Sequence, residues 1–342
     1  MGEGSGGGPV TLGVWPTPVE AAPRLARALG LGAGDLWVKR DDLTGLGGGG
    51  NKVRKLEWTC GEAVAGGATV LVTTGAPQSN HARLTAAAGA RLGLDVVLVL
   101  SGEPGGSASG NIALDGLFGA RVVWAGRTDG AGLAARAERV TDELRQGGAV
   151  PALIPFGGSS AVGARGYVTC GRELLAQVPD FSTVVTAVGS GGTMAGLVAA
   201  LGSDRVLGVH CGAVPDPAAT VAALASALDP LDPPDPLNPL DPPEPVAPES
   251  LRIRLDQVGA GYSELTEPVM RALLLAARTE GLVLDPIYTG RALAGLAAAV
   301  QDGTLTPGSP TVLLHSGGLP GLFGHPATLA RSEAEIAGRD GR

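Results

Sequence analysis

Short runs of aliphatic residues recur along this chain of 342 residues, and each run ends in glycine or a polar residue. The runs are continuous rather than alternating, which is typical of strands that are buried on both faces of a parallel sheet. They predict strands at 68–75, 95–100, 121–126, 183–189, 205–212 and 311–317.

Segments rich in alanine and leucine lie between several of these runs, for example at 81–93 and 195–202, and they predict helices. Alternating strands and helices favour an α/β fold with open, twisted, mostly parallel sheets that carry helices on both faces. Ligands of such sheets bind beyond the carboxyl ends of the strands. The polar residues at the strand ends are therefore where chemistry is expected.

Residues 228–250 interrupt this pattern with repeated Leu-Asp-Pro units. Each proline fixes φ and lacks an N–H donor, so the segment cannot form a helix or a central strand. We interpret it as an extended surface insertion, with docking of a partner as the alternative.

Composition narrows the classes of function. The net charge is −8 and no cluster of basic residues occurs, which argues against a nucleic-acid partner. The N-terminal residues do not resemble a signal peptide, and no apolar stretch is long enough to span a membrane. Cys60, Cys170 and Cys211 are too widely spaced for a metal site and are expected as core residues. These features predict a cytoplasmic enzyme without a metal.

The segment "LGGGGNKVRKLE" at 46–57 is the first candidate for chemistry. Glycine tolerates positive φ and close approach of the backbone, so the run predicts a sharp bend before a helix that starts near Lys52. A lysine at a helix N-terminus is less favoured as an ammonium ion, which helps an amine that must attack a carbonyl. An exposed lysine after a flexible loop is the alternative.

Two further segments place polar groups at the start of a predicted helix. Ser79, Asn80 and His81 could hold a carboxylate there, or Ser79 or Asn80 could simply cap the helix. Ser190, Gly191, Gly192 and Thr193 form a glycine-rich turn suited to a phosphate. This turn lacks the third glycine of a dinucleotide fingerprint and the lysine of a P-loop.

Near the C-terminus, Tyr262 and Tyr288 lie in glycine-flanked segments, with buried structural tyrosines as the alternative, and Ser316 lies at the end of the last predicted strand. A lysine, a phosphate site and a carboxylate site together suit pyridoxal phosphate with an amino-acid substrate.

The motifs "WVKRDDLTG", "GGNKVRKLEW", "QSNHAR", "GSGGTMAGL", "DPIYTGRA" and "HSGGLPGLFG" resemble, in this order, the fold-type II pyridoxal-phosphate enzymes that include D-cysteine desulfhydrase and 1-aminocyclopropane-1-carboxylate (ACC) deaminase. The resemblance implies a tryptophan synthase β-like fold and a homodimer. It also implies a large cofactor-binding domain from 1–51 and 167–342, which contains the proline-rich insertion, and a small domain from 52–166.

The same resemblance implies roles for individual residues. Lys52 would bind the cofactor covalently, Asn80 the ring oxygen, and residues 190–193 the phosphate, with Tyr288 and Ser316 beside the ring. Ser79 and the adjacent amides of Asn80 and His81 would hold the substrate carboxylate. Lys52 or Ser79, assisted by Tyr262 or Tyr288, would remove the α-proton.

The expected substrate depends on two positions where ACC deaminases carry glutamate and leucine. Here they are Thr289 and Ser316, as in the hydroxyl-bearing D-cysteine desulfhydrases. A neutral hydroxyl near the ring nitrogen makes the ring a weaker electron sink, which suffices when thiolate is the leaving group. The sequence thus favours β-elimination from D-cysteine to pyruvate, sulfide and ammonia. The alternatives are ACC deamination, elimination from D-serine, β-chloroalanine or cysteate, β-replacement, and a non-catalytic binding protein.

Overall fold

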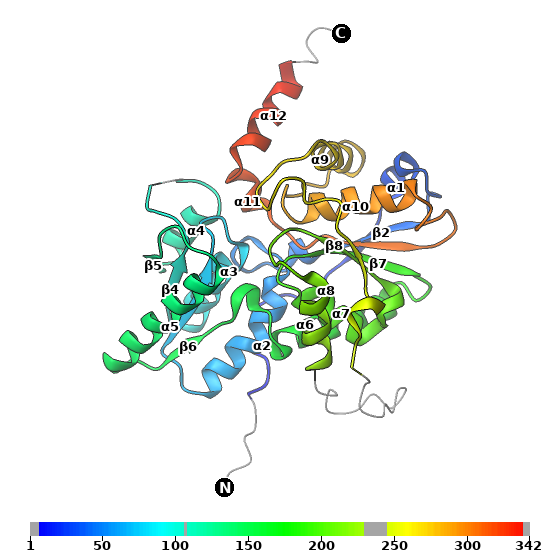
Figure 1. Cartoon of the computed structure of the whole chain (residues 1–342). Coiled ribbons are helices and arrows are strands. Elements are labelled where there is room, and N and C mark those ends of the chain that lie inside the picture. The colour runs from blue at the N-terminus through cyan, green and yellow to red at the C-terminus, as the bar shows by residue number, and fades with distance from the viewer. Residues whose placement is uncertain (1–6, 106–107, 229–244, 338–342) are drawn as a thin grey trace.

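Two separate sheets organise the chain in the computed structural model, which describes residues 7–105, 108–228 and 245–337 (Figure 1). The larger sheet has six strands in the order β1-β2-β10-β7-β8-β9. Their bounds are β1 (Val19–Ala21), β2 (Leu36–Lys39), β7 (Thr183–Val188), β8 (Val206–His210), β9 (Arg252–Arg254) and β10 (Thr311–Leu314). Neighbouring strands are parallel except β1 and β2, which are antiparallel.

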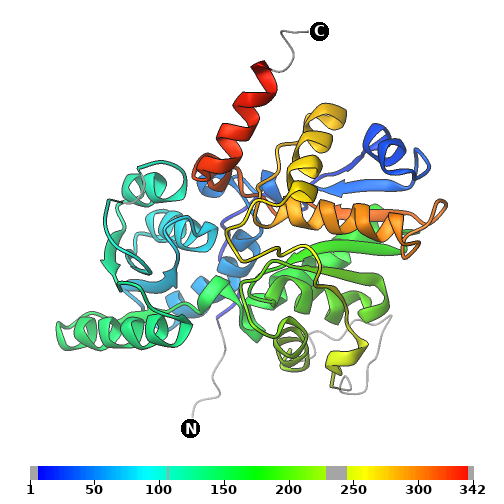
Figure 2. The same cartoon turned by 45° about the horizontal axis from the view of Figure 1, so that its top comes forward.

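The smaller sheet has four parallel strands in the order β5-β4-β3-β6. It consists of β3 (Val70–Gly75), β4 (Asp95–Leu100), β5 (Arg121–Trp124) and β6 (Pro151–Leu153). Figure 2 shows the two sheets in separate halves of the molecule, with part of α2 (Lys52–Ala65) between them.

Helices cover both faces of each sheet because alternate strand residues point to opposite sides. On the larger sheet, Val185 and Ala187 pack under one layer of helices, whereas Val184 and Val188 pack under the other. The first layer comprises α1 (Pro23–Leu29), α9 (Glu267–Glu280) and α10 (Thr289–Gln301), and the second comprises α6 (Ala161–Gln177), α7 (Gly192–Leu201) and α8 (Pro217–Ser226).

The smaller sheet is covered in the same way. Helices α2 and α3 (Asn80–Leu92) pack on one face, and α5 (Gly130–Gln146) packs on the other. The remaining helices are α4 (Asn111–Leu117), α11 (Leu319–Phe323) and α12 (Pro326–Ala337), and short 3₁₀ turns complete the fold. In Figure 1, α12 projects from the body of the molecule.

A buried ionic network fixes the direction of α2. The Arg54 guanidinium donates to both oxygens of Asp41 at 2.8 and 2.9 Å, and it also contacts Glu173 of α6 at 2.7 Å. Arg54 and Asp41 are 2% exposed or less, so their charges are compensated within the core rather than by water. The network therefore holds the helix that begins at Lys52 against the larger sheet and α6.

The predicted α/β fold with mostly parallel sheets is confirmed. All six predicted strands are present, and the helices expected at 81–93 and 195–202 correspond to α3 and α7. The sequence pattern did not identify β1, β2, β6 and β9, which have only three or four residues each. Runs that short carry little periodic signal because a strand pattern needs several alternations.

The predicted division into domains remains a prediction. Its first boundary, at 51/52, coincides with the start of α2, and its second, at 166/167, falls inside α6. Most of the proline-rich segment lies outside the described residues. Cys60, Cys170 and Cys211 are free and buried, as expected. Within the described ranges, no helix is both long and apolar enough to cross a membrane.

Candidate functional site

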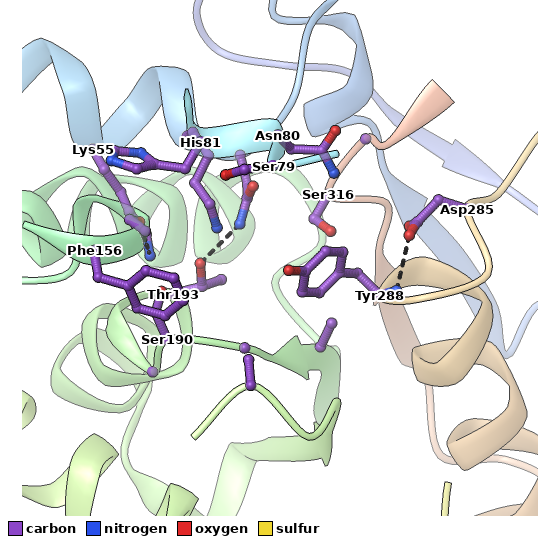
Figure 3. A pocket seen from close by; sticks show the side chains of 18 residues that line it. Lys55, Ser79, Asn80, His81, Phe156, Ser190, Thr193, Asp285, Tyr288 and Ser316 are labelled. Atoms are coloured by element: carbon purple, nitrogen blue, oxygen red, sulfur yellow. Dashed lines mark hydrogen bonds between the residues drawn. The ribbon is translucent and has the colours of Figure 1, made fainter. Parts of the chain in front are cut away.

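One pocket collects the ends of strands from both sheets. Ser79 and His81 follow β3, Phe156 follows β6, Ser190 follows β7, and Ser316 follows β10. All these strands are parallel to their neighbours within their sheets, so their carboxyl ends open toward the same space. Figure 3 shows Lys55, His81, Phe156 and Ser190 on one side of this space, and Asp285, Tyr288 and Ser316 on the other.

The glycine run ahead of Lys52 adopts a conformation that only glycine readily supplies. Gly45, Gly47, Gly48, Gly49 and Gly50 all have positive φ. A Cβ added at Gly49 would lie 1.9 Å from the carbonyl oxygen of Asp42. The predicted sharp bend is therefore present, and α2 begins at Lys52 as expected.

Asn51 joins this bend to two other parts of the pocket. Its backbone N–H donates to the Ser316 carbonyl at 2.9 Å, and its side-chain amide donates to Thr193 Oγ1 at 3.0 Å. The start of α2 is thus tied to the segments after β7 and β10, which lie more than a hundred residues away in sequence.

Lys52 lies at the pocket with its amine free. Among the described residues, Lys52 Nζ has neither a hydrogen-bond nor a salt-bridge partner, although Asp285 also lines the pocket. Burial lowers the pKa of Lys52 to about 8, a shift that Cys211 and Asp285 oppose. At pH 7 roughly a tenth of this lysine is therefore a neutral amine, the form that nucleophilic attack on a carbonyl requires, far more than for an ordinary lysine.

This pKa predicts how Lys52 reacts with aldehydes. Because only the neutral amine attacks, we expect reductive methylation of Lys52 to rise with pH and to reach half its maximum near pH 8. The labelled peptides are simple to assign because the chain contains only three lysines, Lys39, Lys52 and Lys55. Peptide mass spectrometry after labelling at several pH values measures it, with a lysine-containing model peptide as the control. A midpoint near 10.5, the ordinary lysine value, would show that burial does not act on this amine.

Lys55, which the sequence analysis did not single out, is a second lysine of the pocket. It is 1% exposed, and its ammonium donates to Ser159 Oγ at 3.0 Å and toward the Gly157 carbonyl at 3.4 Å. Burial, together with the nearby Lys52, lowers the pKa of Lys55 well below the usual lysine value. Helical spacing offered a signal for it, because residues three apart on a helix share a face.

The glycine-rich turn after β7 lies directly beside Lys55. Gly191 has φ +87°, and α7 starts at Gly192 with its first backbone N–H groups directed at the pocket end. The Gly192 N–H donates to Ser159 Oγ at 3.2 Å, and the Ser190 and Ser159 hydroxyls lie 2.8 Å apart. A lysine, two hydroxyls and a helix N-terminus converge here, which suits a doubly charged anion such as a phosphate.

At the start of α3, Ser79 has the capping role that the sequence left open, and its place in the pocket is compatible with the other. Ser79 caps the helix, because its hydroxyl oxygen accepts from the Ala82 N–H at 3.1 Å, and it also lines the pocket. The Asn80 side-chain oxygen accepts from Asn111 at 3.0 Å, which leaves the Asn80 amide nitrogen without a partner among the described residues. Asn80 can therefore donate a hydrogen bond to a ligand.

His81 lines the pocket, but its ring Nε2 is hydrogen-bonded to Thr73. Thr73 donates its hydroxyl proton to the Ile154 carbonyl, so the His81 ring Nε2, 2.9 Å from Thr73 Oγ1, must be the donor to it. Burial and the nearby lysines hold the pKa of His81 well below its usual range. The imidazole is thus neutral at physiological pH.

Tyr288 and Tyr262 form a pair in which only Tyr288 lines the pocket. Their hydroxyls hydrogen-bond to each other, and their rings meet edge to face with centroids 6.1 Å apart. Burial raises the pKa of Tyr262 to about 12 and that of Tyr288 well above its usual value. Both phenols therefore stay protonated at neutral pH and can act as hydrogen-bond donors.

Asp285, also not singled out by the sequence, is the one carboxylate among the described residues that line the pocket. Its two oxygens accept hydrogen bonds from the backbone N–H groups of residues 287, 288 and 289 and from the Thr289 hydroxyl, at 2.7 to 3.0 Å. Asp285 thus accepts hydrogen bonds from the free backbone N–H groups at the start of α10. Thr289 faces Asp285 rather than the pocket. Ser316 presents its hydroxyl to the pocket (Figure 3).

Most of the residues expected at the site meet in this pocket. Those that line it are Lys52, Ser79, Asn80, His81, Ser190, Gly191, Thr193, Tyr288 and Ser316. Gly192, Tyr262 and Thr289 do not line it, although Tyr262 and Thr289 hydrogen-bond to the lining residues Tyr288 and Asp285. Lys55, Phe156 and Asp285 also line it, although the sequence analysis did not name them.

Comparison with known proteins points to one family. A family model described as "Pyridoxal-phosphate dependent enzyme" matches residues 10–317. A protein of Pyrococcus abyssi named "Putative 1-aminocyclopropane-1-carboxylate deaminase" is 40% identical over 318 residues, 92% of each chain. A D-cysteine desulfhydrase of Klebsiella pneumoniae is 38% identical over 324 residues, 91% of this chain and 94% of the relative.

Solved structures agree with this similarity. The crystal structure of an ACC deaminase homologue is 34% identical and superposes with a TM-score of 0.81, covering 95% of this chain and 96% of that one. A threonine deaminase, 24% identical with a TM-score of 0.59 over 88% of this chain and 93% of that one, shares the fold.

Proposed function

Because the chain belongs to the family of pyridoxal-phosphate dependent enzymes, we propose that it is a lyase that eliminates the β-substituent of a small amino acid, with D-cysteine as its substrate. The family's cofactor is pyridoxal phosphate. The names of its relatives divide between D-cysteine desulfhydrase and ACC deaminase. What we propose is therefore the choice of D-cysteine over ACC as the substrate.

The residues of the pocket fit the cofactor. Lys52 and Lys55 are buried amines at one cavity without a salt bridge to any carboxylate among the described residues, and a bound anion would favour their protonated forms. Lys55, Ser190 and the start of α7 would hold the phosphate, and the free Asn80 amide would donate to the ring oxygen. Lys52 would bind the aldehyde.

When bound, pyridoxal phosphate withdraws electrons from the α-carbon of the amino acid and so makes its proton acidic. Ser79 and the free N–H groups at the start of α3 are suited to hold the substrate carboxylate. Lys52 Nζ, as a neutral amine, can accept the α-proton. The protonated Tyr288–Tyr262 pair can donate a hydrogen bond to the departing sulfur.

The overall reaction balances without a further reactant besides water. The Cβ–S bond breaks, the sulfur leaves as hydrogen sulfide, and the remaining 2-aminoacrylate takes up water to become pyruvate and ammonia. No redox partner is needed, because the electron pair of the α-C–H bond becomes part of the new double bond.

The observation that carries the choice of D-cysteine is that Ser316 presents a hydroxyl to the pocket, while the carboxylate of Asp285 is held in hydrogen bonds to the start of α10. Thr289 hydrogen-bonds to Asp285, whose two oxygens are fully engaged, and Ser316 offers a hydroxyl to the pocket. No carboxylate with a free lone pair is thus presented at these two positions. Neutral groups favour an unprotonated ring nitrogen, which is sufficient when thiolate leaves but weak for opening a cyclopropane.

The test gives cofactor-loaded protein D-cysteine, L-cysteine, D-serine and ACC in separate assays. We expect equal amounts of sulfide and pyruvate from D-cysteine, at a higher kcat/KM than for any of the other three. Sulfide, pyruvate and ammonia are measured, with protein treated with borohydride as the inactive control. Ammonia from ACC with no sulfide from D-cysteine would instead assign ACC deamination. Incorporation of an added thiol into the product would assign β-replacement.

A further inference from the structure

A buried arginine that does not itself line the pocket holds the segment ahead of Lys52. Arg83 of α3 is 0% exposed. Its guanidinium donates to the carbonyl oxygen of Gly47, to that of Gly49 at 3.1 Å, and more weakly to the Asn80 side-chain oxygen at 3.5 Å. One planar cation therefore connects the glycine run to a residue of the cofactor pocket.

The carbonyls that Arg83 binds belong to a loop whose conformation is fixed by few other interactions. Gly47, Gly48, Gly49 and Gly50 have no side chains to pack, and glycine has more conformational freedom than any other residue. Around this loop, Thr44 Oγ1 accepts from the Gly50 N–H at 2.8 Å. The two carbonyl contacts of Arg83 lie on the part of the loop before that bond.

Helix α4 contributes two polar residues to the surroundings of Asn80 and Arg83. Asn111 donates to the Asn80 side-chain oxygen at 3.0 Å, and Asp115, one helical turn further on, lies near Arg83. Asp115 is 1% exposed and neither of its oxygens has a hydrogen-bond partner among the described residues. Burial raises the pKa of Asp115 to about 7, against the opposing effect of Arg83.

We infer that Arg83 is a positioning residue for cofactor attachment, which sets the approach of Lys52 and the orientation of Asn80 through one guanidinium. It acts on Lys52 by holding the Gly47 and Gly49 carbonyls, and on Asn80 by sharing its side-chain oxygen with Asn111. Asp115 is the nearby acidic group whose charged form favours the Arg83 cation. The inference rests on the proposed function only in that Lys52 binds pyridoxal phosphate.

The guanidinium is specifically suited to this task. It has five N–H donors in a rigid planar fork and can serve three acceptors at once from a fixed position. A lysine ammonium is a compact point charge on a flexible stem and would hold at most part of this set. Arg83→Lys therefore keeps the charge opposite Asp115 while removing the geometry.

The test compares Arg83→Lys and Arg83→Gln with wild type and with Arg91→Lys, a matched control at an exposed position of the same helix. Arg83→Gln guards against failure to fold, because a neutral side chain leaves Asp115 free to take up a proton. Apo-protein is mixed with pyridoxal phosphate. The rate at which the absorbance of bound cofactor appears is measured, and borohydride trapping on Lys52 is quantified by peptide mass spectrometry.

We expect both Arg83 variants to attach the cofactor about 10- to 100-fold more slowly, since a misplacement of about 1 Å costs rates of this order. Arg91→Lys should match wild type, and circular dichroism should show the same folded content for all. In steady-state assays, kcat should fall with KM nearly unchanged. Attachment within twofold of wild type in either folded Arg83 variant would overturn the inference, as would a loss explained entirely by a smaller folded fraction.

These readouts do not depend on the identity of the substrate. If wild type attaches the cofactor but releases no sulfide from D-cysteine, the proposed substrate fails while the Arg83 comparison still stands. If D-cysteine is consumed and the Arg83 variants attach normally, the proposed function stands and the role of Arg83 fails.

Discussion

Lys52→Ala is expected to abolish covalent attachment of pyridoxal phosphate and to lower turnover by on the order of 10⁴-fold. Lys52 Nζ is the amine of the pocket without a protein partner, and its pKa of about 8 leaves it partly neutral. The variant removes both the group that binds the aldehyde and the base for the α-proton. Loss of cofactor absorbance, together with the pyruvate assay, measures the two effects.

The matched control is Lys55→Ala, one helical turn away. Lys55 donates to Ser159 and is buried beside the glycine-rich turn, so it should not bind the aldehyde. After borohydride reduction, the cofactor should be found on the peptide at Lys52 in wild type and in Lys55→Ala. A cofactor adduct on Lys55, or full activity in Lys52→Ala, would contradict the assignment.

Lys55→Met should weaken cofactor binding about 10- to 100-fold, which corresponds to the loss of one charge-assisted hydrogen bond. Methionine fills a similar volume, so the change removes the charge without opening a large cavity. The expected defect lies in the dissociation constant for pyridoxal phosphate, whereas kcat at saturating cofactor should change little. Equilibrium titration of the apo-protein, followed by cofactor absorbance, separates the two.

Pyridoxal, which lacks the phosphate, provides the control ligand. If Lys55 and the start of α7 bind the phosphate, the variant and wild type should differ much less for pyridoxal than for pyridoxal phosphate. An equal loss for both ligands would show that Lys55 acts through the shape of the pocket instead.

The residues that follow strands were the part of the site best predicted from sequence. Ser79, Ser190 and Ser316 were identified because in parallel sheets the polar residue after a buried run marks the ligand edge. Lys52 was identified because a glycine run before a helix has few structural explanations. Each signal is local, since it can be seen within about ten residues.

Residues whose role depends on a distant neighbour were missed. Lys55 looks like any polar residue of α2 until Ser159, 104 positions away, is placed next to it. Asp285 looks like a turn residue until the pocket closes around it. Thr289, which was predicted at the substrate, does not line the pocket, and its hydroxyl donates to the Asp285 carboxylate four residues earlier.

The sequence by itself thus determined the fold class, the strand ends, the bend before Lys52 and the family motifs, because these follow from periodicity and from the backbone limits of glycine. The tertiary structure decided which charges are buried and which donors remain free. The lowered pKa of Lys52, the pairing of Tyr262 with Tyr288 and the buried contacts of Arg83 all arise from packing between segments distant in sequence. Burial and charge pairing depend on three-dimensional proximity, which no local pattern contains.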